Sequence, residues 1–168
     1  YEPFNEQERE DKKEILRQME QADHILTRDN RNAHITVSAW IMDRDRKKVL
    51  MAYHNLYQSW AWLGGHADGD AELKEIREES GLESVRFVTE DIFSLEILTV
   101  DGHEKRGSYV PSHLHLNVTY LLEADPELPL RIKEDENSEI GWIGVEEIQR
   151  RSTEKWFVER IYSKLCKK

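Results

Sequence analysis

The sequence predicts an α+β fold, arranged as an α/β/α sandwich with an additional helix at the N-terminus. Segments typical of strands outnumber those typical of helices, and the helical segments lie at the start, the middle and the end of the chain. This order favours a mixed sheet over regular βαβ units. The length of 168 residues suits a single domain. Five Trp, six Tyr and four Phe provide large core side chains, which argues against full disorder.

The N-terminal segment 5–19 is rich in residues that favour helices and contains neither Pro nor Gly. Ile15, Leu16 and Met19 form a short apolar stripe near its end. We therefore predict a helix that packs on the domain through this stripe. Residues 1–32 are interpreted as a helical extension, and residues 33–168 as the domain itself.

Strands are predicted from β-branched and alternating apolar residues. In segment 34–41, Ile35, Val37, Ala39 and Ile41 share one face, and the charged turn 43–48 predicts a hairpin with segment 48–53. Further strands are expected at 60–63, 85–89, 91–100, 115–122 and 141–144. We expect a helix at 74–80, a long loop at 101–112, a turn at 125–129, a polar acidic loop at 131–139 and amphipathic helices within 145–167.

Charge and cysteine content exclude several classes of function. The chain carries 24 Lys and Arg against 34 Asp and Glu, a net charge of −10, which disfavours binding to long nucleic acids through their phosphates. The single cysteine, Cys166, excludes an intrachain disulfide and a zinc site built from several thiolates, and it suits a reducing, cytoplasmic location. No apolar run approaches the roughly 18 residues that a membrane span needs.

The predicted helix 74–80 contains the largest group of candidate metal-binding residues in the sequence. Glu75, Glu78 and Glu79 stand at positions i, i+3 and i+4, so their carboxylates lie on one helix face. Such a trio either faces solvent, which is the commoner case for a helix alone, or is stabilised by a hard divalent cation such as Mg²⁺. The preceding Gly64-Gly65 pair allows a close backbone approach, and the carbonyl of Gly65 is a further candidate ligand.

The joint pattern closely resembles the signature of the Nudix hydrolases, G-x5-E-x7-R-E-U-x-E-E-x-G-U, where U is apolar. Lys74 stands at the Arg position, Glu75 at the first Glu of this helix, Glu78 and Glu79 at the Glu pair, and the remaining matches are Ile76, Gly81 and Leu82. The resemblance covers residues 33–165 and implies a Nudix-like fold.

This resemblance implies hydrolysis of a nucleoside diphosphate linked to another group, with Mg²⁺ as the cofactor and Mn²⁺ as an alternative. Glu75, Glu78, Glu79 and the carbonyl of Gly65 would be the metal ligands. Either Glu75 or Glu78 would deprotonate the attacking water, and Lys74 would orient a glutamate of the box. Lys does this with less geometric control than Arg.

One departure from the family pattern concerns its length. Lys74 follows Gly65 by nine positions, whereas the family box has fourteen, so five residues are absent between Asp70 and Lys74. The favoured interpretation is that the protein has five further residues at this position, which the present sequence leaves out. The alternative is a true deletion, which would favour a nucleotide-binding module without turnover.

Residues outside the box are candidates for further roles. The resemblance suggests Glu136, preferred over Glu134, as an additional catalytic acid or base, although a solvated acidic loop is the commoner situation. His66, His103 and Arg106 are candidate substrate-binding residues, the last two from a small basic cluster that could bind a terminal phosphate.

Four further residues have ordinary structural explanations. His113 and His115, two positions apart, should share one face of a strand, but no Cys or third His accompanies them. A structural or substrate-lining role is therefore favoured over zinc binding. Trp60 and Trp62 alternate along a strand, so one is expected in the core while the other could border the site and stack on a base.

The leading hypothesis is Mg²⁺-dependent hydrolysis of the diphosphate bond in a small nucleotide derivative. The alternative is a non-catalytic module that binds a nucleotide or a sugar nucleotide on the same fold. An isoprenoid diphosphate isomerase is disfavoured because Cys166 lies too near the C-terminus for a core catalytic thiol. The identity of the substrate is not readable from the sequence, and the N-terminal helix is a candidate homodimer contact.

Overall fold

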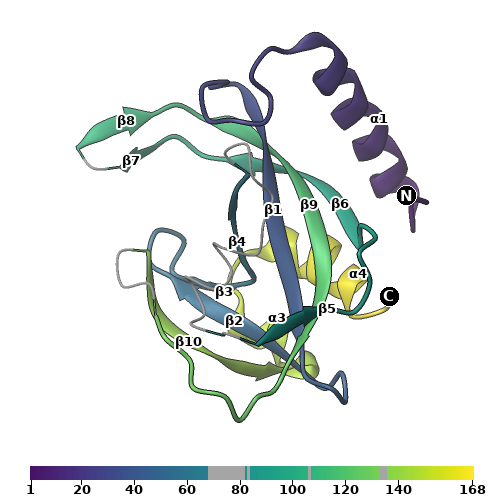
Figure 1. Cartoon of the computed structure of the whole chain (residues 1–168). Coiled ribbons are helices and arrows are strands. Elements are labelled where there is room, and N and C mark those ends of the chain that lie inside the picture. Colours follow the sequence, from purple (N-terminus) through teal and green to yellow (C-terminus); the bar gives the residue numbers. More distant parts are fainter. Residues whose placement is uncertain (68–81, 83, 106, 133–135) are drawn as a thin grey trace. The chain divides into compact units, whose positions relative to one another are not determined.

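The computed structural model describes residues 1–67, 82, 84–105, 107–132 and 136–168 (Figure 1). The chain divides into two compact units, which are described separately. Unit 1 comprises 1–37, 65–72 and 91–119, and unit 2 comprises 38–64, 73–90 and 120–168. Strands β1 (Ala33–Met42), β4 (Leu63–His66) and β9 (His113–Ala124) each contribute residues to both units.

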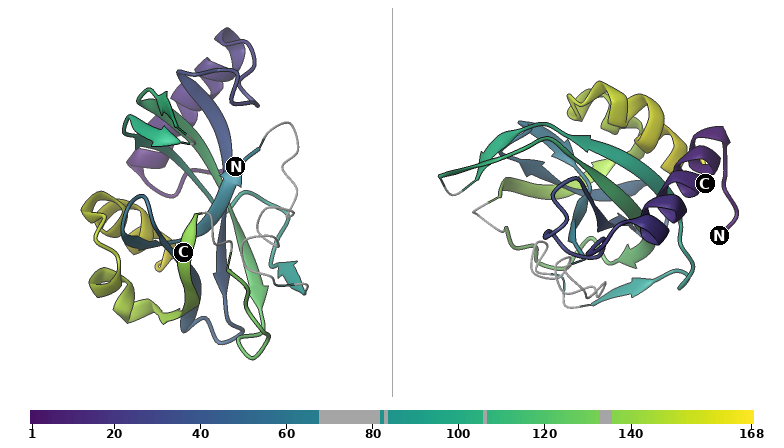
Figure 2. Two further views of the ribbon diagram at one scale, coloured as in Figure 1. Left: turned by 90° about the vertical axis from the view of Figure 1, so that its left-hand side faces the viewer. Right: turned by 90° about the horizontal axis from the view of Figure 1, so that it is seen from above.

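Unit 1 begins with helix α1 (Glu6–Gln21), which confirms the predicted N-terminal helix. The side chain of Asn5 caps it by accepting a hydrogen bond from the backbone N–H of Glu8, with an N···O distance of 2.9 Å. The helix packs on β6 (Ser94–Val100), as the two views in Figure 2 show. Ile15 is buried in this contact region, whereas Leu16 and Met19 remain exposed. The predicted apolar stripe therefore contributes one of its three residues to the core.

The sheet of unit 1 is built on the pairing of β6 with the first half of β9. The two strands are antiparallel, with register running from Ser94 opposite Thr119 to Val100 opposite His113. The shared core contains Ile15, Ile25, Ala33, Ile35, Ala67, Leu95 and Leu116.

Segment 101–112 forms a hairpin rather than the expected long loop. Strand β7 (His103–Lys105) pairs antiparallel with β8 (Ser108–Val110). Gly107 lies in the turn with a φ of 76°, a conformation that glycine adopts without steric cost. The strands are short and polar, so the apolar alternation on which the prediction relied is missing from them.

A polar network lies inside unit 1, beneath α1. Glu8, Ser94 and Glu96 are fully buried, and the hydroxyl of Ser94 bridges the two carboxyl groups. Asn117 and Thr119 on β9 each donate a hydrogen bond to Glu96, with donor–acceptor distances of 3.0 Å. This network joins α1, β6 and β9 through polar contacts in addition to apolar ones.

Unit 2 contains the predicted hairpin, in which the end of β1 pairs antiparallel with β2 (Lys48–His54). On its other edge β2 pairs with β10 (Asn137–Gly144), and at its end it also pairs with the short strand β3 (Ser59–Ala61). Strand β5 (Val85–Phe87) pairs with the second half of β9. Because β10 begins at Asn137, the expected acidic loop 131–139 is wrong at its C-terminal end, and the strand expected at 141–144 is longer than predicted.

The C-terminal part of unit 2 is helical, as predicted. It comprises η1 (Val145–Glu147), α3 (Ile148–Arg151), the π-helical segment η2 (Phe157–Tyr162) and α4 (Ser163–Leu165). Tyr162 is buried and stacks on Trp40 of β1, with ring centroids 5.7 Å apart. These elements, together with α1 and the strands, confirm the α+β class. None of the described helices has the length and apolar character that crossing a membrane requires.

The spacing within the box is shorter than in the family pattern, because Lys74 follows Gly65 by nine positions. Residues 70–74, where five residues would be absent, lie outside the described residues, so both the interpretation that they are missing from the sequence and that of a true deletion stay predictions. The predicted helix 74–80 lies outside the described residues.

Candidate functional site

The residues of the box divide between those that the structure describes and those outside it. Gly65 and His66 lie on β4, half-buried. The carboxylates of Glu75, Glu78 and Glu79 lie outside the described residues, as do Lys74 and Arg106. Their proposed roles therefore rest on the sequence pattern.

The two ends of the box are fixed in the core of unit 2. Leu63, directly before the paired glycine, and Leu82, the last apolar position of the box, are each 1% exposed. Both belong to a hydrophobic cluster that contains Ala39, Ile41, Leu50, Ala52, Val85, Leu122 and Ala124. The segment that carries the box acids thus starts and finishes at one core.

Glu136 lies directly before β10 and is half-buried. Its backbone carbonyl accepts a hydrogen bond from the backbone N–H of Asn55, which follows β2, at 3.0 Å. This bond extends the β2–β10 pairing by one step and fixes the backbone from which the Glu136 carboxylate projects. Glu134 lies outside the described residues.

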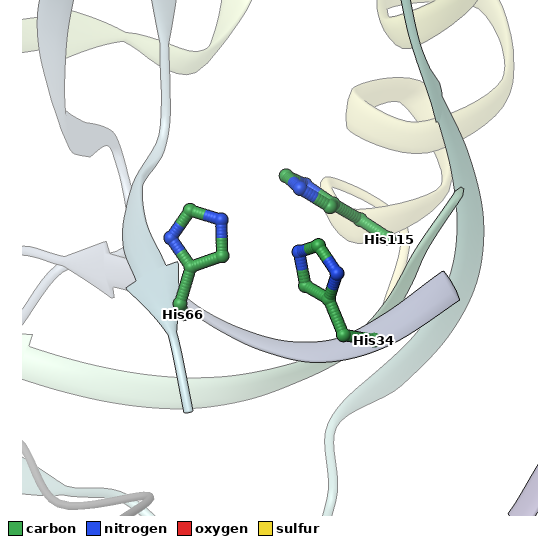
Figure 3. A group of neighbouring side chains, drawn as sticks. All are labelled: His34, His66 and His115. Carbon is green, nitrogen blue, oxygen red and sulfur yellow. The ribbon is translucent and has the colours of Figure 1, made fainter. Parts of the chain in front are cut away.

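Four histidine rings gather in unit 1. The ring centroid of His34 on β1 lies 5.1 Å from that of His66 on β4, and 5.1 and 5.0 Å from those of His113 and His115 on β9. His66 and His115 are themselves 5.2 Å apart. Figure 3 shows the rings of His34, His66 and His115 converging on one another. The candidate nitrogen ligands of these three lie within 4.8 Å of one another.

Backbone carbonyls orient two of these rings. Nδ1 of His34 lies 3.0 Å from the carbonyl oxygen of Asn30, and Nδ1 of His113 lies 2.9 Å from that of Pro111. A carbonyl oxygen only accepts hydrogen bonds, so each Nδ1 carries the proton and each Nε2 carries the lone pair. Nε2 of His113 then accepts a hydrogen bond from Nε2 of His115, at 3.2 Å.

The surroundings of His115 favour its neutral form. Burial, which has the largest effect, together with the neighbouring His66, His34, His113 and His103, whose positive charges would repel its own, lowers the pKa of His115 to about 2. A neutral imidazole retains a lone pair for a proton or a metal ion. His115 therefore offers an uncharged nitrogen donor at neutral pH.

His103, the other histidine proposed to bind substrate, lies at the edge of this group. It is on β7, its Nδ1 lies 2.9 Å from the carbonyl oxygen of Asp101, and its ring centroid is 6.3 Å from that of His113. The structure thus brings His66 and His103 into the same neighbourhood.

Sequence reasoning missed His34. It treated this residue only as the start of a strand, and it left His113 and His115 without a third ligand. The third and fourth rings come from β1 and β4, which are distant in sequence from β9. The available signal was that His34 and His115 each begin a predicted strand, and that His113 and His66 lie two and three residues from one.

The two tryptophans before the box lie in aromatic clusters of unit 2, and neither is fully buried. Trp60 makes an edge contact with Tyr53, at 6.0 Å between centroids. Trp62 makes edge contacts with Phe157 and Tyr162, at 6.1 and 5.7 Å. Both rings therefore contribute to packing, and the proposal that one of them stacks on a base stays a prediction.

Comparison with known proteins identifies similar sequences and folds. The family model described as NUDIX domain matches residues 32–165. No curated protein matches the chain. Among solved structures, a NUDIX-family hydrolase from Clostridium perfringens is 19% identical, with a TM-score of 0.51, over 80% of this chain and 97% of its own.

Two further solved structures have similar folds. An Ap4A hydrolase from C. elegans is 17% identical, with a TM-score of 0.53, over 78% of this chain and 91% of its own. A dihydroneopterin triphosphate pyrophosphohydrolase from E. coli is 13% identical, with a TM-score of 0.53, over 77% of this chain and 94% of its own. At these identities the likeness concerns the fold.

Proposed function

The chain belongs to the Nudix hydrolase family, and from this premise we propose that it hydrolyses the diphosphate bond of a small nucleotide derivative with the help of Mg²⁺. The observation that carries this proposal is the box itself: Gly65, Lys74 and three glutamates in family order, within a family match that spans residues 32–165. Structural neighbours named as an Ap4A hydrolase and a pyrophosphohydrolase agree with this class of reaction.

The donor set of the box suits magnesium. Glu75, Glu78 and Glu79 would supply carboxylate oxygens and Gly65 its carbonyl oxygen, and these are hard ligands of the kind that Mg²⁺ prefers together with water and phosphate oxygens. Mn²⁺ accepts the same ligands. Bound magnesium would supply charge stabilisation at the diphosphate and acidify the attacking water.

The protein side of the reaction is assigned to a few residues. Glu75 or Glu78 would accept the proton of the attacking water, and Lys74 would hold a neighbouring glutamate in place through its ammonium group. Glu136, on backbone fixed by Asn55, would assist as a second acid or base. His66, His103 and Arg106 would contact phosphate oxygens of the substrate.

The test is a panel of ADP-ribose-like molecules, nucleoside triphosphates, dinucleoside polyphosphates and sugar nucleotides. The purified chain is incubated with each compound in Mg²⁺, in Mn²⁺ and in EDTA, and phosphate and nucleoside monophosphate are measured. The proposal predicts metal-dependent release from at least one class. A Glu136→Gln variant should lower kcat on that substrate by about 10²-fold, the lower end for a general acid or base.

The box is five residues shorter than the family pattern, and this spacing supports a second candidate, a nucleotide-binding module without turnover. Calorimetric titration of the same panel in Mg²⁺ separates the two. Tight binding of a panel member without product after prolonged incubation would establish the module and overturn the hydrolase. That residues 1–32 extend the Nudix domain and provide a homodimer contact stays a prediction, and sedimentation of the full chain over a range of concentrations would test the dimer.

A further inference from the structure

We propose that His34, His66 and His115 form a second metal site, selective for a divalent transition ion, with zinc as the expected occupant. The site lies within unit 1, and none of its ligands is a glutamate of the box. It goes beyond the proposed hydrolysis and does not depend on it.

The three rings lie near enough to one another to share one metal ion. The three candidate nitrogens lie within 4.8 Å of one another. A tetrahedral zinc with bonds of about 2.0–2.1 Å holds its nitrogen ligands roughly 3.3 Å apart. Small rotations of the half-buried rings of His66 and His115 would bring the nitrogens to this spacing, as their convergence in Figure 3 illustrates.

The chemistry of the ligands selects the metal. Imidazole nitrogens suit Zn²⁺, Ni²⁺ and Cu²⁺, whereas Mg²⁺ and Ca²⁺ require oxygen ligands. The cluster is therefore chemically distinct from the box, which offers carboxylates.

The surrounding hydrogen bonds match those of metal-binding histidines. The backbone carbonyl of Asn30 accepts a hydrogen bond from Nδ1 of His34. Nε2 of this buried ring therefore carries the lone pair and is the atom that would bind the metal. Carbonyl acceptors commonly orient metal-bound imidazoles in this way. The carbonyl of Pro111 holds the ring of His113, whose Nε2 accepts a hydrogen bond from Nε2 of His115. Nδ1 of His115 is then the atom of that residue that would bind the metal. His113 is thus assigned as a positioning residue.

Three nitrogen ligands leave at least one coordination position open. Closed structural zinc sites have four protein ligands, whereas sites with three admit water or an anion. His66 directly follows Gly65 of the box in sequence. An ion held there would bind an anionic oxygen more strongly than a neutral imidazole does.

The experiment titrates zinc into the full chain, produced without a histidine tag and stripped with EDTA, and follows binding by calorimetry. The wild type should bind one zinc ion at this site. His66→Asn and His115→Asn should each lower zinc affinity by at least roughly 100-fold, because loss of an outer-shell partner alone costs about 10–100-fold and these residues are direct ligands. His24→Asn, which alters an exposed histidine of the same unit, is the matched control and should bind as the wild type does.

Two further measurements complete the test. The Tm should rise with zinc in the wild type and in His24→Asn but not in His66→Asn, and circular dichroism without metal confirms that each variant is folded. A Glu78→Gln variant should retain the zinc site even if it loses hydrolysis. Unchanged zinc affinity in both histidine variants, loss of zinc binding in Glu78→Gln, or no binding by the stripped wild type would each overturn the proposal.

Discussion

Leu63 and Leu82 are buried in the same hydrophobic cluster of unit 2, although one precedes the paired glycine and the other ends the Nudix box. Both ends of the box are therefore anchored on one core. The spacing from Gly65 to Lys74, which is five residues shorter than in the family pattern, falls between these two anchors.

Removing one anchor should destabilise the domain. Leu82→Ala deletes a side chain that is 1% exposed, so we expect the free energy of unfolding to fall by about 2–5 kcal/mol. Leu56→Ala, which truncates a leucine that is 49% exposed, is the control and should change it by about 0.5 kcal/mol or less. Urea denaturation measures both. Equal losses in the two variants would contradict the anchoring role of Leu82.

Restoring the family spacing separates the two functional candidates. Five alanines inserted between Asp70 and Lys74 lengthen a segment whose ends are fixed, at a cost of well under about 1 kcal/mol in loop closure. The hydrolase account predicts that the wild type already turns over substrate, with kcat/KM at least as high as that of the insertion variant. Hydrolysis by the insertion variant alone would show that the natural chain is a binding module.

The buried network of unit 1 should be sensitive to loss of its central hydroxyl. Ser94 bridges the fully buried Glu8 and Glu96, so Ser94→Ala removes one hydrogen-bond partner from this pair of carboxyl groups. We expect a loss of about 2–3 kcal/mol in the free energy of unfolding. The matched control is Thr99→Ala, an exposed position on the same strand. If both variants unfold at the same urea concentration, the network contributes no net stability.

A half-buried glutamate near the C-terminus should make stability depend on pH. Burial raises the pKa of Glu154 from its ordinary 4.5 to about 7. The folded state therefore binds its proton more tightly than the unfolded state does, so this stabilising contribution is complete below pH 4.5 and is lost as the pH rises through 7.

Glu154→Gln should remove that dependence. Between pH 4.5 and pH 8 we expect the free energy of unfolding of the wild type to fall by about 1–2 kcal/mol relative to that of the variant. This range is smaller than the full pKa shift implies, because the side chain is half-buried rather than buried and solvent screens it. Parallel pH profiles of the two proteins would contradict the assignment.

Local sequence patterns predicted much of the fold. The helix-forming composition of residues 5–19 located α1, and the β-branched alternation around Ile35 located β1. The hairpin β7–β8 was missed because its strands are three residues long and polar, and they form through cross-strand hydrogen bonds around Gly107. The start of β10 at Asn137 was not predicted because its first three residues, 137–139, are polar and lack the apolar alternation that indicates a strand.

The candidate site was predicted only where its residues are close in sequence. Glu75, Glu78 and Glu79 stand out because a helix repeats every 3.6 residues, and this regularity is visible without a structure. The histidine group is different, since His34, His66 and His115 come from three strands. Their convergence depends on strand pairing and register, which one sequence read by itself does not specify.

The central claim is that the glutamates of the box drive hydrolysis, and the most direct measurement compares kcat in Mg²⁺ for Glu78→Gln and Glu127→Gln on the substrate found in the panel. Both substitutions remove one negative charge, but Glu127 is exposed and lies outside the box. We predict that Glu78→Gln lowers kcat on the order of 10²–10⁴-fold while Glu127→Gln retains wild-type turnover. Wild-type turnover by Glu78→Gln would contradict the account.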